Sequence, residues 1–408
     1  MELSRYTTSP FGEARRTSGA HGYVAYFPRP IPRTVTLPLS TVRRLGDAEA
    51  ALGRLAGVGQ LLSSPQLLLR PYLLREALAS TRIEGTQATM AEIFDADATG
   101  QALNPDQEEV LNYLAALEWG LDHLATLPLS SRLVREMHRR LMAGVRGRDR
   151  VPGEFRTSQN WIGGAGSTVA DARFVPPPPQ ELPALMSDWE RFANEEAELP
   201  LLVQNALLHS QFETIHPFLD GNGRLGRLLL VFFLQARGRL SAPLLYLSAS
   251  LERDRQRYYD TLQILHESGD PVPWIELFLG AVRTQSMDAV RRAQRIVELR
   301  EQYRQAALGV GTANSLALAD LVCERPLVTT RLVEEHLGVT RPTAVRLLRQ
   351  LAEVGVLSEE GTGARGQRRY AAREMLAAVA GELGDDAAPR DGGRRPAATQ
   401  ATVEPPLR

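Results

Sequence analysis

The segment HPFLDGNGRLGR, residues 216–227, joins two long apolar stretches and contains two closely spaced glycines. The flanking stretches, 201–215 and 225–236, repeat apolar residues at helical spacing, so the segment between them has to be a loop that connects two helices. Gly221 and Gly223 let the backbone turn sharply and bring N–H donors close to an anion, while the second helix points its positive end at the same place. The sequence therefore predicts a phosphate-binding loop within a helical fold.

The chain of 408 residues contains no lysine. A Walker A lysine and a Schiff-base lysine are therefore excluded, and any bound phosphate has to be held by arginine, backbone N–H groups and metal. A formal net charge of −1 argues against a surface that binds nucleic acid everywhere. Cys323 is the only cysteine, which excludes an intrachain disulfide, and we predict that it is a buried apolar residue. No apolar run is long enough to span a bilayer, so we expect a cytoplasmic protein without a membrane partner.

The polar side chains around the loop predict a chemical role. Arg224 and Arg227 are three residues apart on the second helix, so they share a face and can bind successive phosphates of one chain. Asp220 directly precedes the loop, where a carboxylate is typical of a Mg²⁺ ligand, and His216 can take up a proton near neutral pH. The set predicts transfer of a phosphorus group to a hydroxyl. The alternative is a glycine-rich helix start with two surface arginines and a structural histidine.

Position for position, residues 216–227 resemble the Fic family motif His-x-Phe-x-(Asp/Glu)-Gly-Asn-Gly-Arg-x-x-Arg, and the similarity extends over roughly residues 80–265. The resemblance implies a mainly α, Fic-type helical core. It also implies a protein adenylyltransferase, which transfers AMP from ATP with Mg²⁺ to a Tyr, Ser or Thr hydroxyl of a protein target. The implied roles are His216 as the base for that hydroxyl, Asp220 as the Mg²⁺ ligand, Gly221, Asn222 and Gly223 as the anion hole, Arg224 and Arg227 as ligands of the β- and γ-phosphates, and Phe218 as a core residue.

A second resemblance lies upstream, where residues 66–85 form an apolar helical run that ends in STRIEG. A Glu in the last turn of a helix is unfavourable with the helix dipole, so Glu84 needs a positively charged partner. The segment resembles the inhibitory motif (Ser/Thr)-x-x-x-Glu-(Gly/Asn) of many Fic proteins. The resemblance implies that Glu84, in a motif opened by Ser80, pairs with Arg227 and blocks the γ-phosphate site, so that the enzyme is autoinhibited.

Residues 156–180 contain glycines and a run of prolines that exclude a helix and predict a short β-hairpin followed by an extended strap. The segment resembles the Fic flap, whose edge pairs main chain to main chain with the target and places its hydroxyl before His216. An ordinary surface hairpin is the alternative. Of the tyrosines beyond the motif, we take Tyr259 as the candidate nucleotide ligand, and we expect His209 to be a hydrogen-bonded core histidine.

Residues 312–376 resemble a winged helix-turn-helix domain, with a second helix that begins near Thr340 and a glycine-rich strand pair after it. DNA is a candidate partner, because arginines on this helix and on the wing could contact phosphates, but winged helices also dock proteins. An alternative function is therefore a DNA-binding regulator with a nucleotide-sensing Fic core. Two experiments distinguish these functions. Transfer of label from α-labelled ATP to protein would indicate the transferase, and salt-sensitive retention on heparin or DNA would indicate the DNA-binding regulator. The arginines concerned are Arg341, Arg346, Arg365, Arg368 and Arg369.

The expected organisation has four parts. Residues 1–65 form an extended N-terminal docking arm and a first helix; residues 66–307 form the catalytic domain with the inhibitory helix (66–85), the flap (156–180) and the motif (216–227); residues 312–376 follow a hinge at Gly309 and Gly311; and residues 381–408 are disordered. Some points stay open from the sequence. Relatives move other phosphorus groups or remove AMP, modify themselves, or form homodimers, so all of these remain alternatives.

Overall fold

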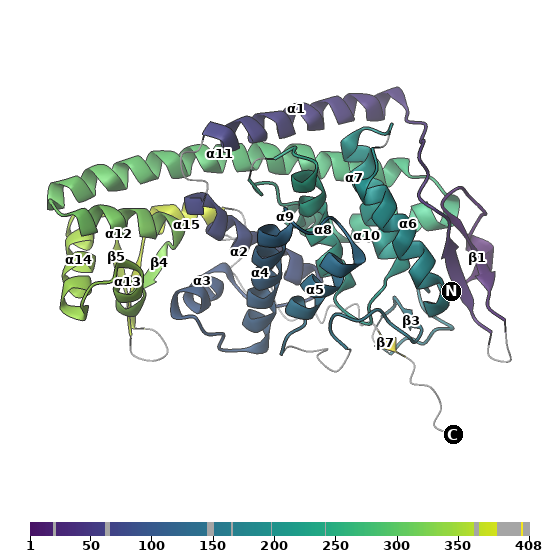
Figure 1. Cartoon of the computed structure of the whole chain (residues 1–408), viewed down its shortest axis with the longest axis horizontal. Helices are drawn as coiled ribbons and strands as arrows, with labels where there is room; N and C mark the ends of the chain where they lie inside the picture. Colours follow the sequence, from purple (N-terminus) through teal and green to yellow (C-terminus); the bar gives the residue numbers. More distant parts are fainter. Residues whose placement is uncertain are drawn as a thin grey trace, which may run out of the picture.

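The computed structural model describes residues 1–18, 22–61, 66–144, 151–164, 166–196, 198–240, 242–362, 367–381 and 401–402. Over these ranges the chain is mainly helical, with three small sheets (Figure 1). The helices are α1 (Leu39–Leu61), α2 (Gln66–Ile83), α3 (Met90–Thr99), α4 (Pro105–His123), α5 (Ser131–Leu141), α6 (Leu182–Asn194), α7 (Leu201–Ile215), α8 (Asn222–Ala236), α9 (Ser248–Arg253), α10 (Arg255–Ser268), α11 (Val272–Val310), α12 (Ala313–Glu324), α13 (Thr330–Leu337), α14 (Arg341–Glu353) and α15 (Arg373–Ala380). The strands are β1 (Gly12–Arg16), β2 (Val24–Pro28), β3 (Asn160–Trp161), β4 (Leu327–Thr329), β5 (Ser358–Thr362), β6 (Arg368–Ala371) and β7 (Ala401–Thr402).

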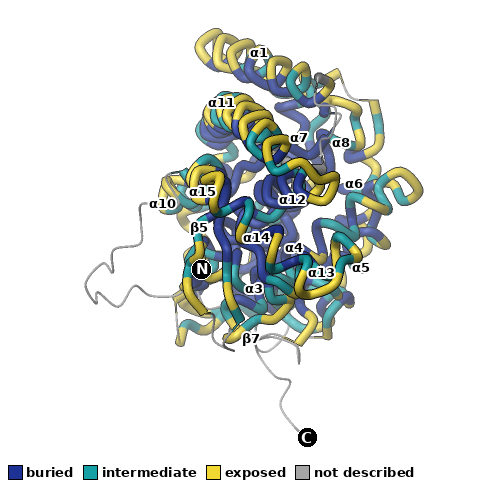
Figure 2. Tube along the Cα trace, turned by 90° about the vertical axis from the view of Figure 1, so that its left-hand side faces the viewer, coloured by how far each residue is buried: buried dark blue, intermediate teal, exposed yellow. Residues whose placement is uncertain are grey.

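The antiparallel helices α7 and α8 form the centre of the core. Nearly every residue of both is buried, because other helices pack around the pair, and Figure 2 shows the tube dark blue through this region. Helix α8 begins at Asn222, three residues before the predicted 225, since the glycine-rich loop itself opens the helix. The phosphate-binding segment is therefore held between two buried helices.

Helix α11 is a single helix of 39 residues that runs along one side of the molecule, with α1 lying beside it (Figure 1). Its buried positions recur at a helical period, as at Trp274, Phe278 and Val282, so one face packs on the core while the other stays polar. The predicted hinge is corrected at one position. Gly309 lies inside α11, and only Gly311, with a φ of +82°, ends the helix as its C-cap.

The N-terminal arm forms a β-hairpin rather than a single extended segment. Strands β1 and β2 pair in antiparallel register from Gly12 opposite Pro28 to Arg16 opposite Val24. The hairpin also contacts the strap of the flap, because the N–H of Tyr26 donates to the carbonyl of Val175 at 2.9 Å. The arm is thus part of the surface around the flap.

The flap contains little regular strand. Strand β3 has only two residues, and a single bridge joins Ile162 to Phe174 across the hairpin. The main chain of β3 also pairs in antiparallel fashion with residues 401 and 402. The rest of the tail predicted to be disordered, beyond residue 381, lies outside the described residues.

The C-terminal unit begins with α12 and packs against the core. A three-stranded sheet of order β4-β6-β5 lies beside α13 and α14, and α15 continues past residue 376 to Ala380. Arg369 on β6 pairs with Asp95 of α3 at 3.1 Å, so this arginine connects the unit to the core. Cys323 is fully buried, and burial raises the pKa of its thiol to about 12, as expected for an apolar rather than a nucleophilic cysteine.

In the part of the chain that the structure describes, none of the helices combines the length and the apolar character needed to cross a bilayer.

Candidate active site

His216 lies at the C-terminal end of α7 in a left-handed backbone conformation, with φ 49° and ψ 60°. Histidine is one of the few non-glycine residue types that adopt this conformation at low cost. Its ring nitrogen Nδ1 lies 3.2 Å from the carbonyl oxygen of Glu213. A carbonyl can only accept, so Nδ1 carries the hydrogen and Nε2 of the neutral ring carries the lone pair. The ring lines a pocket, which suits Nε2 to take a proton from a bound group.

The loop after His216 is held in shape by Asn222. The side chain of Asn222 accepts from the N–H of Phe218 at 2.9 Å and donates to its carbonyl at 2.8 Å. Gly221 is the N-cap of α8, with a φ of +78°, and a Cβ at this position would lie 2.8 Å from the sulfur of Met142. The first N–H groups of α8 have no acceptor within the helix. The backbone amides of residues 221–223 fit the predicted anion hole, whereas the side chain of Asn222 holds the loop.

Arg224 presents unused donors at this helix start. The residue is buried, and within the described ranges its Nε and Nη1 atoms have no hydrogen-bond partner. Its guanidinium lies 3.8 Å from Glu109 and 3.5 Å from Asp220. Buried donors without acceptors are costly, so the arrangement fits an anion that accepts from them.

Asp220 lies at the edge of the loop with its side chain about one third exposed. Its Oδ1 accepts from the N–H of Gly221 at 2.6 Å, which fixes the orientation of the carboxylate. Carboxylate oxygens are the ligands that Mg²⁺ prefers, so this residue fits the predicted metal ligand.

Arg227 is buried and contacts the end of α2. Its Nε donates to the hydroxyl of Ser80, and its Nη2 donates to the carbonyl of Ser80 and to Oε1 of Glu84, each at 2.8 Å. Burial alone would raise the pKa of Glu84, but the Arg227 guanidinium outweighs it and holds that pKa below its usual value. Glu84 and Arg227, 143 residues apart in sequence, thus form a partly buried ion pair at the site expected for the γ-phosphate.

Glu84 also lies directly over the start of α8. A Cβ built on Gly223 would be only 2.5 Å from Oε1 of Glu84, so a side chain at position 223 would exclude the carboxylate. The carboxylate is a negative group at the positive end of a helix, which is a favourable place for it. It therefore occupies the kind of position that a phosphate would take.

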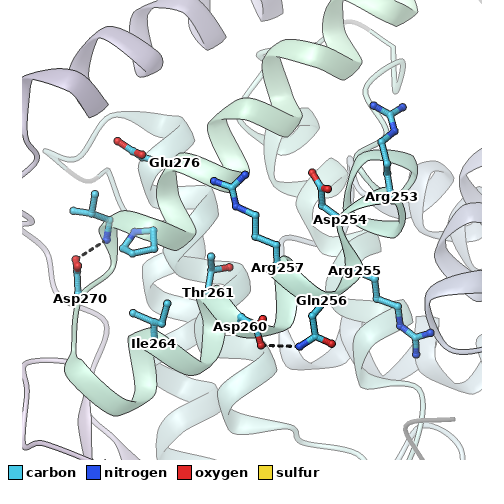
Figure 3. A pocket seen from close by; sticks show the side chains of 12 residues that line it. Arg253, Asp254, Arg255, Gln256, Arg257, Asp260, Thr261, Ile264, Asp270 and Glu276 are labelled. Carbon is cyan, nitrogen blue, oxygen red and sulfur yellow. Dashed lines mark hydrogen bonds between the residues drawn. The ribbon is translucent and has the colours of Figure 1, made fainter. Parts of the chain in front are cut away.

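Glu84, His216, Gly223 and Arg227 line one pocket of about 670 Å³, a volume within the range of nucleotide-sized ligands. Ile162 and Phe174 of the flap and Leu262 of α10 supply apolar lining. Tyr259, the candidate ligand, lines the pocket, and so does the more deeply buried Tyr258. Three pocket residues also border a neighbouring groove around the start of α10, shown in Figure 3: Arg253, Arg255 and Gln256.

His209 is a structural residue, as predicted. Its Nδ1 lies 3.1 Å from the carbonyl of Gly226, and its Nε2 lies 2.9 Å from the hydroxyl of Tyr258. Burial lowers its pKa to about 3, so the ring stays neutral. It does not line the pocket.

Three residues near the loop were not identified from the sequence. His138 on α5 stacks on Phe218 with ring centroids 3.7 Å apart, and its Nε2 lies 2.9 Å from the carbonyl of Asp220. Arg156 donates to the carbonyl of His216, and Asn160 donates to that of Phe218. None of these contacts belongs to a local motif, so spacing along the chain gave no signal for them.

Glu213 gives a prediction on pH and stability. Burial raises the pKa of its carboxyl to about 8, although Arg227 acts in the opposite direction. Between its ordinary pKa of 4.5 and about 8, the folded protein keeps a proton on Glu213 that the unfolded chain has released, so stability falls as pH rises through this window. Glu213→Gln removes this penalty. Thermal unfolding should therefore show a stabilisation of the variant over the parent that grows by several degrees from about pH 5 to about pH 8.5.

The matched control is Glu198→Gln, which removes an exposed carboxylate from the loop before α7. Its unfolding midpoint should follow that of the parent at every pH. A difference between Glu213→Gln and the parent that stays constant with pH would show that Glu213 does not titrate in this way.

Comparison with known proteins places the site in a family. Residues 42–122 match the model described as Fic/DOC family N-terminal, and residues 128–234 match the model described as Fic/DOC family. Over 241 residues the chain is 28% identical to "Protein adenylyltransferase Fic" of Drosophila willistoni and 27% identical to that of Drosophila persimilis. The match covers 57% of this chain but only 45% and 44% of those relatives, so less than half of their length is represented here.

Two solved structures share the fold. A Fic family protein from Desulfovibrio desulfuricans G20 superposes with a TM-score of 0.54 at 22% identity, over 84% of this chain and 98% of its own. Fic-1 from C. elegans superposes with a TM-score of 0.52 at 20% identity, over 64% of this chain and 74% of its own. At these identities the structures show the mainly helical fold alone.

Proposed function

Because the chain belongs to the Fic/DOC family, we propose that it is a protein adenylyltransferase that transfers AMP from ATP to a hydroxyl of a protein and is autoinhibited by Glu84. The observation that carries the proposal is the buried guanidinium of Arg224, whose Nε and Nη1 lack partners in the described part of the chain beside the amides of residues 221–223. Of the residues at this helix start, Gly223 lines the same pocket as His216 and Arg227. A nucleotide triphosphate satisfies all of these donors with one ligand.

The nucleotide is held by residues along one path through the pocket. The amides at the start of α8 contact the α-phosphate, Arg224 contacts the β-phosphate, and Arg227 contacts the γ-phosphate. Tyr259 lines the part of the pocket that takes the adenine base. Asp220 would hold Mg²⁺, which would supply positive charge beside the departing pyrophosphate.

The reaction follows from the tautomer of His216. Nε2 takes the proton of the target hydroxyl as its oxygen forms a bond to the α-phosphorus, and the bond from that phosphorus to the bridging oxygen of pyrophosphate breaks. The helix amides stabilise the charge that develops on the α-phosphate oxygens. The Glu213 carbonyl keeps the hydrogen of the neutral ring on Nδ1, so that Nε2 starts the reaction unprotonated.

The experiment is incubation of the Glu84→Gly protein with ATP and Mg²⁺, alone and with cell lysate, followed by mass spectrometry. A gain of one AMP on the protein itself or on a lysate protein supports the proposal, and the modified residue identifies the acceptor hydroxyl. Transfer from γ-labelled but not α-labelled ATP would instead indicate phosphate transfer, and loss of AMP from a modified target would indicate removal.

A role for the C-terminal unit in binding DNA is a second candidate. Its elements follow the order of a winged helix-turn-helix, and α14 carries Arg341, Arg346 and Arg349 exposed on its surface. Two arginines of the supposed wing are instead engaged within the protein, since Arg368 pairs with Glu359 and Arg369 with Asp95. Arg365 lies outside the described residues. We therefore rank DNA binding below the transferase activity. Retention of the protein on heparin that is abolished by salt would support DNA binding.

A further inference from the structure

Arg156 is a buried arginine with no acidic partner among the described residues, and its neighbours explain why it is tolerated. Its Nε donates to the carbonyl of His216 at 2.9 Å, and its Nη2 donates to the carbonyls of Pro177 at 2.6 Å and Ile215 at 3.3 Å. Its own N–H donates to the carbonyl of Pro217 at 2.9 Å. Burial lowers the pKa of Arg156 to about 9, as expected for a guanidinium that only carbonyls surround.

Two of the carbonyls that Arg156 contacts, those of Ile215 and His216, belong to the end of α7. The last carbonyls of a helix lack donors within the helix and carry the negative end of its dipole. Here the helix ends at Ile215, and His216 turns out of it in the left-handed conformation. A planar guanidinium presents its donors in a rigid fork and can satisfy several such carbonyls at once. Arg156 is therefore a C-terminal cap for the helix that carries the catalytic base.

Asn160 reinforces the same contact from β3. Its Nδ2 donates to the carbonyl of Phe218 at 2.9 Å and to that of His216 at 3.3 Å, and it is buried. Through Arg156 and Asn160, both arms of the flap are joined to the backbone on either side of His216: β3 through Asn160, and the strap through Pro177. The flap and the catalytic base thus share one hydrogen-bond network.

We propose that Arg156 and Asn160 are positioning residues that hold the backbone of His216 and the flap in a fixed position relative to each other. The His216 ring then lies within reach of the hydroxyl of a target docked on the flap. The inference rests on the proposed transferase function. It predicts that loss of either side chain lowers kcat and leaves nucleotide affinity nearly unchanged. The phosphate ligands lie on α8. Asn222 holds the preceding loop through both the N–H and the carbonyl of Phe218, and Asn160 shares only that carbonyl.

The test uses the full chain in the Glu84→Gly background. Arg156→Ala should lower kcat roughly 100-fold, because a displacement of about 1 Å between reacting groups has a cost of that order. Asn160→Ala should lower it roughly tenfold, while the Kd for ATP changes by less than about threefold in both. Millimolar guanidinium should restore part of kcat in Arg156→Ala but not in Asn160→Ala. Arg191→Met, which changes an exposed arginine of α6, is the matched control and should behave as the parent.

A second readout does not depend on activity. In ¹⁵N-labelled protein the Nδ1–H signal of His216 reports its hydrogen bond to Glu213, and this signal should shift or broaden in both variants. If the parent transfers no AMP, the proposed function fails, while the signal still tests the positioning role. If Arg156→Ala does not fold, kcat and the Nδ1–H signal of His216 are both measured on Asn160→Ala. An unchanged signal with kcat within about threefold of the parent, or a loss of ATP affinity that parallels the loss of kcat, would overturn the inference.

Discussion

Replacing Glu84 by glycine raises the rate of AMP transfer by at least about tenfold, which corresponds to roughly 1.4 kcal/mol of activation free energy. The reason is the ion pair of Glu84 with Arg227, at 2.8 Å, in which the carboxylate also covers Gly223. Without the carboxylate, Arg227 should be free to bind the γ-phosphate. The α-phosphorus should then lie close enough to His216 for the hydroxyl that His216 deprotonates to attack it. Initial rates with α-labelled ATP, compared between variant and parent, measure the effect.

Two further variants separate charge from backbone effects. Glu84→Gln keeps a side chain of the same size but loses the charge, so its rate should lie between those of the parent and Glu84→Gly. Gln87→Gly introduces glycine at an exposed position of the same loop, away from the pocket, and should leave the rate unchanged. Equal activation by Gln87→Gly would mean that loosening of the loop, rather than release of Arg227, explains the result.

Replacing His216 by asparagine in the Glu84→Gly protein lowers kcat about 10² to 10⁴-fold, the usual contribution of a general base. Asparagine is chosen because it tolerates the left-handed backbone at this position better than alanine does. The phosphate ligands are untouched, so the Kd for ATP should stay close to that of the parent. Single-turnover rates and ATP titrations, made on the same preparations, distinguish the two quantities.

The control for this substitution is His123→Asn, which changes a histidine at the end of α4 outside the pocket. Both variants should unfold at temperatures close to that of the parent. A His216→Asn protein that keeps kcat within about tenfold would show that another group accepts the proton, and the assignment of the base would then be wrong.

The parts of the site that the sequence predicted are those built from neighbouring residues. Gly221, Gly223 and the two arginines lie on one loop and one helical turn, where spacing alone fixes their relation. The predicted helix at 201–215 agrees with α7 residue for residue. The contact between Glu84 and Arg227 joins residues far apart in the chain, and it was reached only through the resemblance to a known motif.

The residues that the sequence did not reveal act on backbone carbonyls. Arg156 and Asn160 recognise the end of α7, and His138 contacts the carbonyl of Asp220. A carbonyl is present at every position of a chain, so nothing in the local sequence marks which ones a distant side chain will reach. The sequence also did not reveal that α11 continues through Gly309. One glycine costs a helix only about 1 kcal/mol, which packing against the core readily offsets.

The continuous helix α11 is a rigid connection between two parts of the molecule. At a rise of about 1.5 Å per residue, its 39 residues form a rod nearly 60 Å long, shared by the catalytic core and the C-terminal unit. A rod transmits orientation as well as distance, unlike a flexible tether. The orientation of the C-terminal unit relative to the pocket at His216 is consequently set by one continuous helix.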